Sequence, residues 1–214
     1  MAAKVKRTRR YDSARRRHAA QRRRAAVVEA ARRLFLREGF SGTTIAKIAE
    51  DAGVSEETVY KAFGNKIALV RAVRDQALAG AGPVHAERRS DRMQASEKDP
   101  RQIIQGWGVL TMEVAPRVAP VLLLVRDAAA SDPELAGLQA EMDAARLTRM
   151  THNARTLLEA GHLRRGITLA EATDVLWTYS SPELYDMLVI RRGWAVERYG
   201  QFIADAMIAA LLPG

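Results

Sequence analysis

The sequence of 214 residues contains no cysteine and only four histidines. Without cysteine, disulfide bonds, thiolate zinc sites and cysteine nucleophiles are all excluded. The histidines, at positions 18, 85, 152 and 162, do not show the close spacing that is typical of metal ligands. We therefore expect no metal site, and no motif in the sequence indicates any other cofactor.

The patterns by which catalytic sites are recognised are also missing. There is no glycine-rich phosphate loop, no nucleophile elbow and no paired-carboxylate signature. An enzyme with a basic tail remains an alternative, but we expect a protein without catalytic activity.

Long uncharged segments are absent as well. Stretches such as 102–112 fall well short of the roughly 20 apolar residues that a membrane-spanning helix needs. The arginine pair at positions 9 and 10 is not followed by the apolar segment of a secretion signal. We therefore expect a cytoplasmic protein that has no membrane partner.

Positive charge is concentrated near the N-terminus. Residues 1–24 contain eleven basic residues and one acid, a net charge of +10, whereas the whole chain has a net charge of +9. The rest of the chain is thus close to neutral. A basic arm favours binding to a polyanion, which is nucleic acid or an anionic membrane surface. The alternative is a tail that only improves solubility. We expect residues 1–24 to form a flexible arm.

Helical periodicity predicts an all-α protein. Apolar residues recur at intervals of three and four along nearly the whole chain, and no segment shows convincing strand alternation. The first helix is expected to end at Gly39, and short helices follow at about 43–51 and 55–62. These three helices form a compact unit at 25–64, and a longer helix begins near Lys66.

Residues 65–214 are predicted to form a larger helical body. Asp99-Pro100 and Asp132-Pro133 each combine a capping residue with a proline suited to the first helical position. Thr168 forms a capping box with Glu171, three residues later. Three helix starts can therefore be placed from local signals alone.

Two segments of this body are less regular. Residues 87–99 are polar and charged without an apolar face, which indicates a loop. Pro116 and Pro120 are expected to interrupt the helix that contains them. The apolar run at 121–125 is expected to be a short buried helix, although its length also suits a strand.

The segment at 43–66 has the pattern of a helix-turn-helix. In this motif the first helix rests on the DNA backbone, and polar side chains early in the second helix face base edges in the major groove. At these positions the chain resembles the tetracycline-repressor (TetR) family of bacterial regulators. The matching residues are Ala31, Leu34, Phe35, Gly39, Phe40, Thr43, Thr44, Ile45, Ile48, Ala49, Ala52, Gly53, Val54, Ser55, Thr58, Val59, Tyr60, Phe63, Lys66 and Leu69.

The resemblance implies a homodimer that places its two recognition helices in successive major grooves of a palindromic operator in double-stranded DNA. It implies DNA contacts by Thr43, Thr44, Ser55, Glu56, Glu57, Thr58, Tyr60, Lys61 and Lys66. The basic arm is expected to follow phosphates or to reach the minor groove through Arg22, Arg23 and Arg24. Carboxylates at Glu56 and Glu57 could accept a hydrogen bond from cytosine N4. The helix dipole alone is another explanation for acids in this first turn.

The resemblance also implies that the larger body binds a small effector and forms the dimer. A pocket of this class favours a hydrophobic or amphipathic ligand, and its candidate residues are Trp107, Thr111, Leu122, Arg126, Met142, His152, Trp177 and Tyr179. The last two helices offer apolar faces for an isologous interface, with Leu184, Tyr185, Leu188, Tyr199, Phe202, Ile203 and Met207 as candidates. For both sets, packing in the protomer's own core is the alternative.

The sequence therefore predicts a transcriptional repressor that leaves its operator when the effector binds. An activator with the same fold, a sequence-indifferent DNA-binding protein and a membrane-surface protein remain alternatives. The membrane alternative accounts for the basic arm but leaves residues 43–66 unexplained. Salt-dependent DNA binding with a sequence preference separates the first hypothesis from the last two alternatives.

Overall fold

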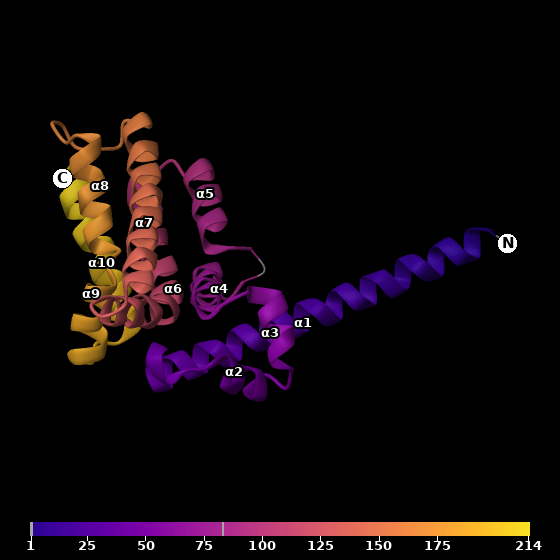
Figure 1. The fold of residues 1–214 in the computed structure, drawn as a ribbon. Helices are drawn as coiled ribbons and strands as arrows, with labels where there is room; N and C mark the ends of the chain where they lie inside the picture. Colours follow the sequence, from indigo (N-terminus) through magenta and orange to yellow (C-terminus); the bar gives the residue numbers. More distant parts are fainter. Residues whose placement is uncertain (1, 83) are drawn as a thin grey trace. The chain divides into compact units, whose positions relative to one another are not determined.

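The chain is all-α, as its periodicity predicts. The computed structural model describes residues 2–82 and 84–214, with side chains from residue 17 onward, and no strand occurs among them. The chain forms two compact units, the first ending at Val73 and the second beginning at Arg74, so the division falls inside α4 and later than the boundary expected after residue 64. The helices in Figure 1 are α1 (Ala2–Gly42), α2 (Ile45–Asp51), α3 (Glu56–Phe63), α4 (Lys66–Ala79), α5 (Ala86–Ser96), α6 (Pro100–Ala129), α7 (Pro133–Glu159), α8 (Leu169–Tyr179), α9 (Pro182–Tyr185), the π-helix η1 (Asp186–Arg191) and α10 (Val196–Leu211).

Helix α1 is the long helix of the first unit, and it includes the basic segment at the N-terminus. A flexible arm was expected there, but the helix extends back to Ala2 (Figure 1). Alanine and arginine are strong helix formers, and residues 1–24 contain no glycine or proline that would stop a helix. The regular helix is interrupted at Gly39, as predicted, because this residue has a φ of 73°.

Capping side chains fix the starts of α2 and α3. Thr44 Oγ1 accepts a hydrogen bond from the N–H of Lys47, and Ser55 Oγ accepts one from the N–H of Thr58, each at 3.2 Å. Gly53, with a φ of 64°, makes the turn between the two helices. The predicted helix-turn-helix is confirmed at these positions. The apolar residues buried in the three helices are Val27, Val28, Ala30, Ala31, Leu34, Phe35, Phe40, Ile48, Ala49 and Val59.

Helix α6 occupies the centre of the second unit. It packs against α5, α7, α9 and α10, while α8 packs against α7 and α10. The shared core includes Ile104 of α6, Leu157 of α7, Leu176 of α8 and Ile203 of α10, each at most 1% exposed. One large apolar core therefore joins helices that lie far apart in the sequence.

The predicted starts of α6, α7 and α8 are confirmed. Asp99 and Asp132 each cap a helix whose first residue is proline. Thr168 and Glu171 form the expected capping box, in which each side chain accepts a hydrogen bond from the backbone N–H of the other residue. Caps are local interactions, which is why a short stretch of sequence is enough to identify them.

The predicted interruption of α6 at Pro116 and Pro120 is wrong. The helix runs through both prolines without a break. Each proline removes one backbone hydrogen bond, but Val118, Ala119 and Val121 beside them are buried, and packing of this kind overrides local propensity. The apolar run at 121–125 is accordingly part of α6.

The loop predicted at residues 87–99 is also wrong, because most of this segment belongs to α5. The buried residues of α5 are Ala86, Ser90 and Gln94, which recur every four residues along one face. Two of these three buried residues are polar. A search for apolar periodicity therefore cannot detect this face.

Among the described residues, α6 is the one helix that is long and apolar enough to cross a membrane. Over an 18-residue window its mean hydropathy is 1.6, and 33% of that window is buried in the protein. Ile103, Ile104 and Trp107 of α6 belong to the core shared with α8 and α10. A central core helix has the same composition, so this hydropathy is weak evidence for a membrane span.

Helices α6 and α10 approach each other closely at two glycines. A Cβ atom on Gly108 would lie 2.8 Å from the carbonyl oxygen of Gly200 and 2.9 Å from the Cβ of Ala204. A Cβ atom on Gly200 would likewise lie 2.8 Å from the carbonyl oxygen of Gly108. Backbone atoms cannot rotate away as the end of a long side chain can. These two glycines therefore set the distance between α6 and α10.

We expect Gly108→Ala to destabilise the protein, because the added methyl group pushes α6 and α10 apart. The expected loss is about 1–3 kcal/mol in the free energy of unfolding, measured by urea titration with circular dichroism. The matched control is Gly137→Ala on α7, where a Cβ atom meets nothing within 4 Å. Alanine in that helix should add about 0.5–1 kcal/mol. Equal effects of the two substitutions would contradict the close crossing.

Candidate functional site

Helix α3 presents a row of polar side chains to solvent in the first unit. Glu56, Glu57, Tyr60 and Lys61 are exposed, whereas Val59 is fully buried and holds the helix to the core. Lys61 Nζ lies 2.7 Å from Glu57 Oε1, one helical turn away. This ion pair offsets part of the negative charge that two glutamates would otherwise present to a phosphate backbone.

Three further predicted DNA contacts, Thr44, Ser55 and Thr58, have hydroxyl groups at the starts of α2 and α3. Thr44 and Ser55 are exposed and serve as N-caps. Thr58 Oγ1 lies 2.9 Å from Ser55 Oγ. A hydroxyl that accepts a capping hydrogen bond still carries a proton to donate. Thr44 can therefore cap α2 and donate to a phosphate at the same time, and one hydroxyl of the Ser55–Thr58 pair keeps a proton to donate.

Thr43 and Lys66, which were also predicted to contact DNA, hold the segment between α1 and α2. Thr43 is fully buried, and its hydroxyl donates to the carbonyl oxygen of Gly39 at 2.8 Å. The Lys66 ammonium donates to the carbonyl oxygens of Phe40 (2.8 Å) and Thr43 (3.1 Å) and lies 3.9 Å from the centre of the Phe40 ring. A DNA contact by the Thr43 side chain is therefore wrong, and Lys66 has a structural role.

The three arginines predicted to bind DNA from α1 differ in their surroundings. Arg24 Nη1 donates to the carbonyl oxygen of Ala62 at 2.9 Å, and its guanidinium lies 4.1 Å from the centre of the Phe63 ring. Arg24 thus links α1 to the end of α3. Arg22 and Arg23 are exposed and have no recorded ion pair among the described residues.

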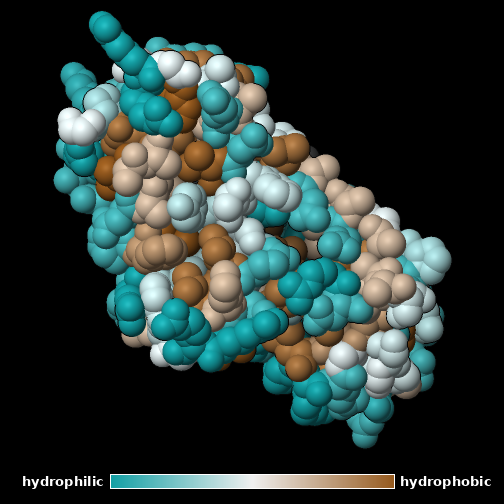
Figure 2. Space-filling model, turned by 90° about the vertical axis from the view of Figure 1, so that its left-hand side faces the viewer, coloured by the Kyte–Doolittle hydropathy of each residue, from teal (hydrophilic) through white to brown (hydrophobic). Residues whose placement is uncertain are grey.

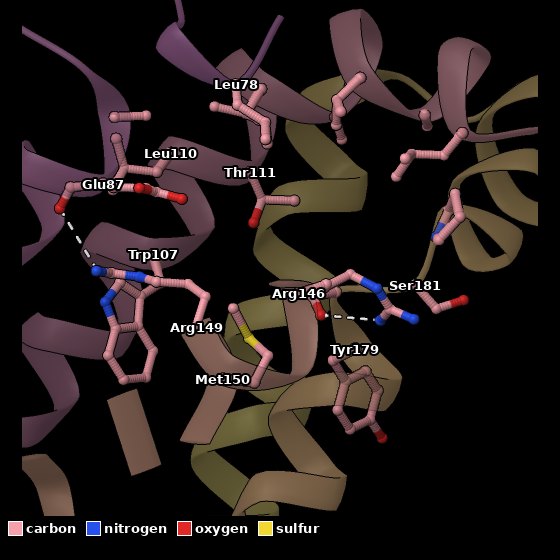
Figure 3. Close-up of a pocket in the computed structure, with 18 of the residues that line it drawn as sticks. Leu78, Glu87, Trp107, Leu110, Thr111, Arg146, Arg149, Met150, Tyr179 and Ser181 are labelled. Carbon is pink, nitrogen blue, oxygen red and sulfur yellow. Dashed lines mark hydrogen bonds between the residues drawn. The ribbon is translucent and has the colours of Figure 1, made fainter. Parts of the chain in front are cut away.

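The second unit contains a cavity of about 540 Å³, part of whose lining is drawn in Figure 3. Five of the eight predicted effector residues line it: Trp107, Thr111, Leu122, Met142 and Tyr179. Most of the remaining wall is apolar and includes Leu78, Leu110, Val114, Ala115, Val118, Met150 and Leu176. A cavity of this volume suits a small organic molecule.

The other three predicted effector residues do not line the cavity. Arg126 pairs with Asp127 at 2.7 Å. His152 is exposed, with Nε2 3.5 Å from a carboxylate oxygen of Asp91. Trp177 lies against the guanidinium of a neighbouring arginine. These three residues were predicted from their aromatic or charged side chains alone, but the helix faces on which they lie do not line the cavity.

Polar residues that the sequence did not single out also line the cavity. Ser90 Oγ accepts hydrogen bonds from Trp107 Nε1 (3.0 Å) and Gln94 Nε2 (3.2 Å). Gln94 Nε2 also lies 3.3 Å from Oδ1 of Asn153, another lining residue. Ser90 and Gln94 belong to α5, the helix mistaken for a loop, so no sequence signal pointed to this group.

Two arginines of α7, Arg146 and Arg149, add positive charge to the cavity wall (Figure 3). Arg149 Nη1 lies 2.7 Å from Asp91 Oδ1, a close ion pair. Arg146 Nη1 donates to the carbonyl oxygen of Trp177 at 2.6 Å and to Ser180 Oγ at 3.2 Å. Burial lowers the pKa of the Arg146 guanidinium from its ordinary value.

Glu113 of α6 fixes the segment between α4 and α5, which contributes to the cavity wall. Its carboxylate accepts hydrogen bonds from both terminal nitrogens of Arg89 (2.6 and 2.8 Å) and from the N–H of Ala81 (2.6 Å). These hydrogen bonds, that of Arg89 above all, lower the pKa of Glu113 to about 2. The carboxylate is therefore ionised at neutral pH, and α6 holds the segment through it.

Four of the seven residues predicted for a dimer interface lie inside the protomer. Tyr185, Tyr199, Ile203 and Met207 are at most 7% exposed and belong to the core of the second unit. The rings of Tyr185 and Tyr199 pack edge to face, 5.5 Å between centroids. An interface role for these four side chains is wrong, because Tyr185 of α9 and the apolar stripe of α10 both face the protomer's own core.

Apolar side chains nevertheless remain on the surface of the second unit. Leu184 and Leu188 are partly buried, and Phe202 is 38% exposed and packs edge to face on Trp194. The space-filling view shows apolar patches among hydrophilic side chains (Figure 2). Other exposed apolar residues of this unit are Val109, Leu147, Leu158, Met187 and Ile190. Nowhere in the described part of the chain do three histidine or carboxylate side chains gather as a metal site would require.

Comparison with known sequences places the first unit among bacterial regulators. The family model of bacterial regulatory proteins of the tetR family matches residues 27–73. YvkB of Bacillus subtilis, an uncharacterized HTH-type transcriptional regulator, is 35% identical over 65 residues, which are 30% of this chain and 34% of YvkB. The HTH-type transcriptional regulator BetI 1 of Chromohalobacter salexigens is 31% identical over 142 residues, which are 65% of this chain and 69% of that protein.

Solved structures of such regulators share the fold of most of the chain. FadR of Bacillus subtilis in complex with stearoyl-CoA has a TM-score of 0.70 at 16% identity, covering 87% of this chain and 98% of FadR. The SmeT–triclosan complex has a TM-score of 0.69 at 20% identity, covering 89% of this chain and 92% of SmeT. SmeT is the repressor of a multidrug efflux pump of Stenotrophomonas maltophilia. At these identities the likeness concerns the fold alone.

We expect Glu113→Gln to lower the free energy of unfolding at neutral pH by about 1 kcal/mol, because a charged hydrogen bond at a partly solvated position becomes a neutral one. A carboxylate with a lowered folded-state pKa stabilises the protein above its ordinary pKa of 4.5, and this stabilisation is lost as the pH falls through about 2. The difference between wild type and variant should therefore shrink over that interval.

Urea titrations at several pH values measure this difference. Glu159→Gln is the matched control, since Glu159 is an exposed carboxylate near the end of α7. Its effect should stay within about 0.5 kcal/mol. A loss for Glu113→Gln that does not depend on pH would show that the ionised carboxylate is not its cause.

Proposed function

The chain belongs to the tetR family of bacterial regulatory proteins, and we propose that it is a homodimeric transcriptional repressor that a small ligand releases from its operator. Its relatives are helix-turn-helix regulators of transcription, and members of this family bind DNA. The dimer, the palindromic operator and the release by ligand are our proposals for this chain.

The observation that carries the proposal is the presence, in one chain, of an exposed recognition helix and a separate cavity. Helix α3 exposes Glu56, Glu57, Tyr60 and Lys61, so its polar face is free to enter a major groove. The second unit encloses a cavity of about 540 Å³ with a mainly apolar wall. A protein that only coated DNA would need no such cavity, whereas a regulator that responds to a ligand does.

On this proposal the side chains of the first unit divide into two roles. Thr44, Tyr60 and the exposed arginines of α1 bind phosphates and set the position on DNA without reading sequence. Glu57 accepts from cytosine N4, and Lys61 reaches a phosphate or a guanine edge. The Glu57–Lys61 ion pair seen without DNA opens when both side chains turn to the groove.

The proposed dimer uses the apolar side chains that the protomer leaves at its surface. Leu184, Leu188 and Phe202 come from the last two predicted helices, and Met187 and Ile190 of η1 extend the same segment of chain. Exposed apolar groups of this size favour burial against a second copy. Two subunits would then present two copies of α3 to a palindromic operator.

Selection of bound fragments from the source genome tests the proposal. The full-length protein is mixed with genomic fragments at near-physiological salt in the presence of competitor DNA. A single palindromic motif is expected. Enrichment without a motif would overturn the operator and support sequence-indifferent binding instead. Transcription from the selected promoter, measured with and without the protein, then distinguishes a repressor from an activator.

We expect Tyr60→Phe to weaken DNA binding about 2–10-fold, because the hydroxyl that would donate to a phosphate is lost while the ring stays. Tyr60 is 51% exposed, so the fold should not change. Fluorescence anisotropy at fixed salt measures the dissociation constant for the selected operator and for random duplex. Thr148→Val, which removes an exposed hydroxyl of α7 outside the cavity lining, is the control and should leave both constants unchanged. A loss confined to the operator would contradict a phosphate contact, because phosphates carry no sequence information.

A further inference from the structure

Arg146 has hydrogen-bond donors left over inside the cavity wall. A guanidinium carries five N–H groups, and Nη1 uses both of its hydrogens on Trp177 O and Ser180 Oγ. Nη2 lies 3.4 Å from Asp143 Oδ1, which is long for a charged hydrogen bond. The Nε–H and one Nη2–H have no acceptor among the described residues. These donors are the kind of group that a bound acid would satisfy.

The positive charge of Arg146 is also less well balanced than that of the other lining arginines. Arg74 pairs with Asp75 at 2.6 Å, and Arg149 pairs with Asp91 at 2.7 Å. The Arg146 side chain is 14% exposed, the most buried of the three, yet its nearest carboxylate is at the longest distance. Burial lowers the pKa of Arg146, because a cation that is removed from water is destabilised unless a close anion compensates it.

We propose that the cavity binds an amphipathic organic acid, with the acid group against Arg146 and the apolar part along α6. This inference rests on the proposed function in taking the cavity as the effector site. Figure 3 shows Arg146 close to Ser181 and Tyr179, and Thr111 and Met150 lie between this group and Trp107. An acid group at one end of the cavity therefore leaves an apolar wall for the rest of the molecule.

The charges around the cavity favour an anion over a cation. Glu87 is the lining carboxylate that has no recorded ion pair among the described residues, and it lies on the opposite side of Figure 3 from Arg146. Glu87 is exposed, so water screens its attraction for a cationic ligand. Arg146 is largely removed from water, so its attraction for an anion is screened much less.

Titration of matched ligands tests the proposal on the full-length protein without DNA. Decanoate and naphthoate are each compared with the alcohol and the amine of the same carbon skeleton, one flexible and one flat. Isothermal titration calorimetry gives the dissociation constants, and the intrinsic tryptophan fluorescence, to which Trp107 in the cavity wall contributes, gives a second readout. At least one acid is expected to bind about tenfold more tightly than its alcohol and its amine. If neither acid binds more tightly than its analogues, the proposal is overturned.

Substitution of the arginine shows whether Arg146 causes the preference. Arg146→Met keeps an unbranched apolar stem but removes the guanidinium and its charge, and the acid should then bind no better than the alcohol. Arg146→Lys restores a charge and should recover part of the preference, even if loss of the contact with Trp177 O makes the methionine variant less stable. Arg126→Met, on an arginine outside the cavity, should leave the preference unchanged. A preference for the acid that survives Arg146→Met would overturn the role of this residue.

Release of the selected operator distinguishes this inference from the function on which it rests. An acid that binds at Arg146 without releasing DNA supports the anion site and contradicts release by ligand. An alcohol or amine that binds more tightly than the acid and releases DNA supports the proposed function and contradicts the anion site. Circular dichroism of each variant confirms that the fold is intact before binding is compared.

Discussion

The close crossing of α6 and α10 is the constraint on which the second unit depends. Gly108 and Gly200 bring the two backbones so near that one side of α6 is committed to α10. Its other apolar residues, among them Trp107, Leu110 and Val114, then line the cavity. Because α10 covers one side of α6 and the apolar cavity lies along another, α6 must be apolar around most of its circumference. These two neighbours explain the high hydropathy of α6, which would also suit a membrane span.

In the first unit, contacts between polar side chains and backbone oxygens hold the helices together in addition to the apolar core. Arg24 binds the carbonyl of Ala62, and Lys66 binds the carbonyls of Phe40 and Thr43. The helix-turn-helix and the break at Gly39 could be predicted, because both depend on a continuous short stretch of sequence. The sequence could not separate a basic residue that binds DNA from one that binds its own backbone, since both belong to the same motif.

The cavity illustrates the same difference between local and distant interactions. Apolar and aromatic residue type was enough to find four of its lining residues, because a large pocket in a helical protein is built from the same side chains as the core. Arg146, Ser90 and Asn153 were missed because their partners lie on other helices. Arg146, for example, binds the carbonyl of Trp177 on α8. Four core residues were assigned to the dimer interface, because an apolar stripe on a helix shows that a face is buried but not what covers it.

On the proposed function, Glu113 connects the cavity to the chain that leads to the DNA-binding unit. It lies on α6 between the lining residues Thr111 and Val114. Its carboxylate binds Ala81, just beyond the end of α4, and Arg89 of α5. A ligand that shifts α6 would therefore act directly on these hydrogen bonds. Coupling between an effector site and a second site is typically about 1–3 kcal/mol, and the hydrogen bonds of this partly solvated carboxylate are expected to contribute about 1 kcal/mol. A rearrangement of Glu113 is therefore comparable with the lower end of that range.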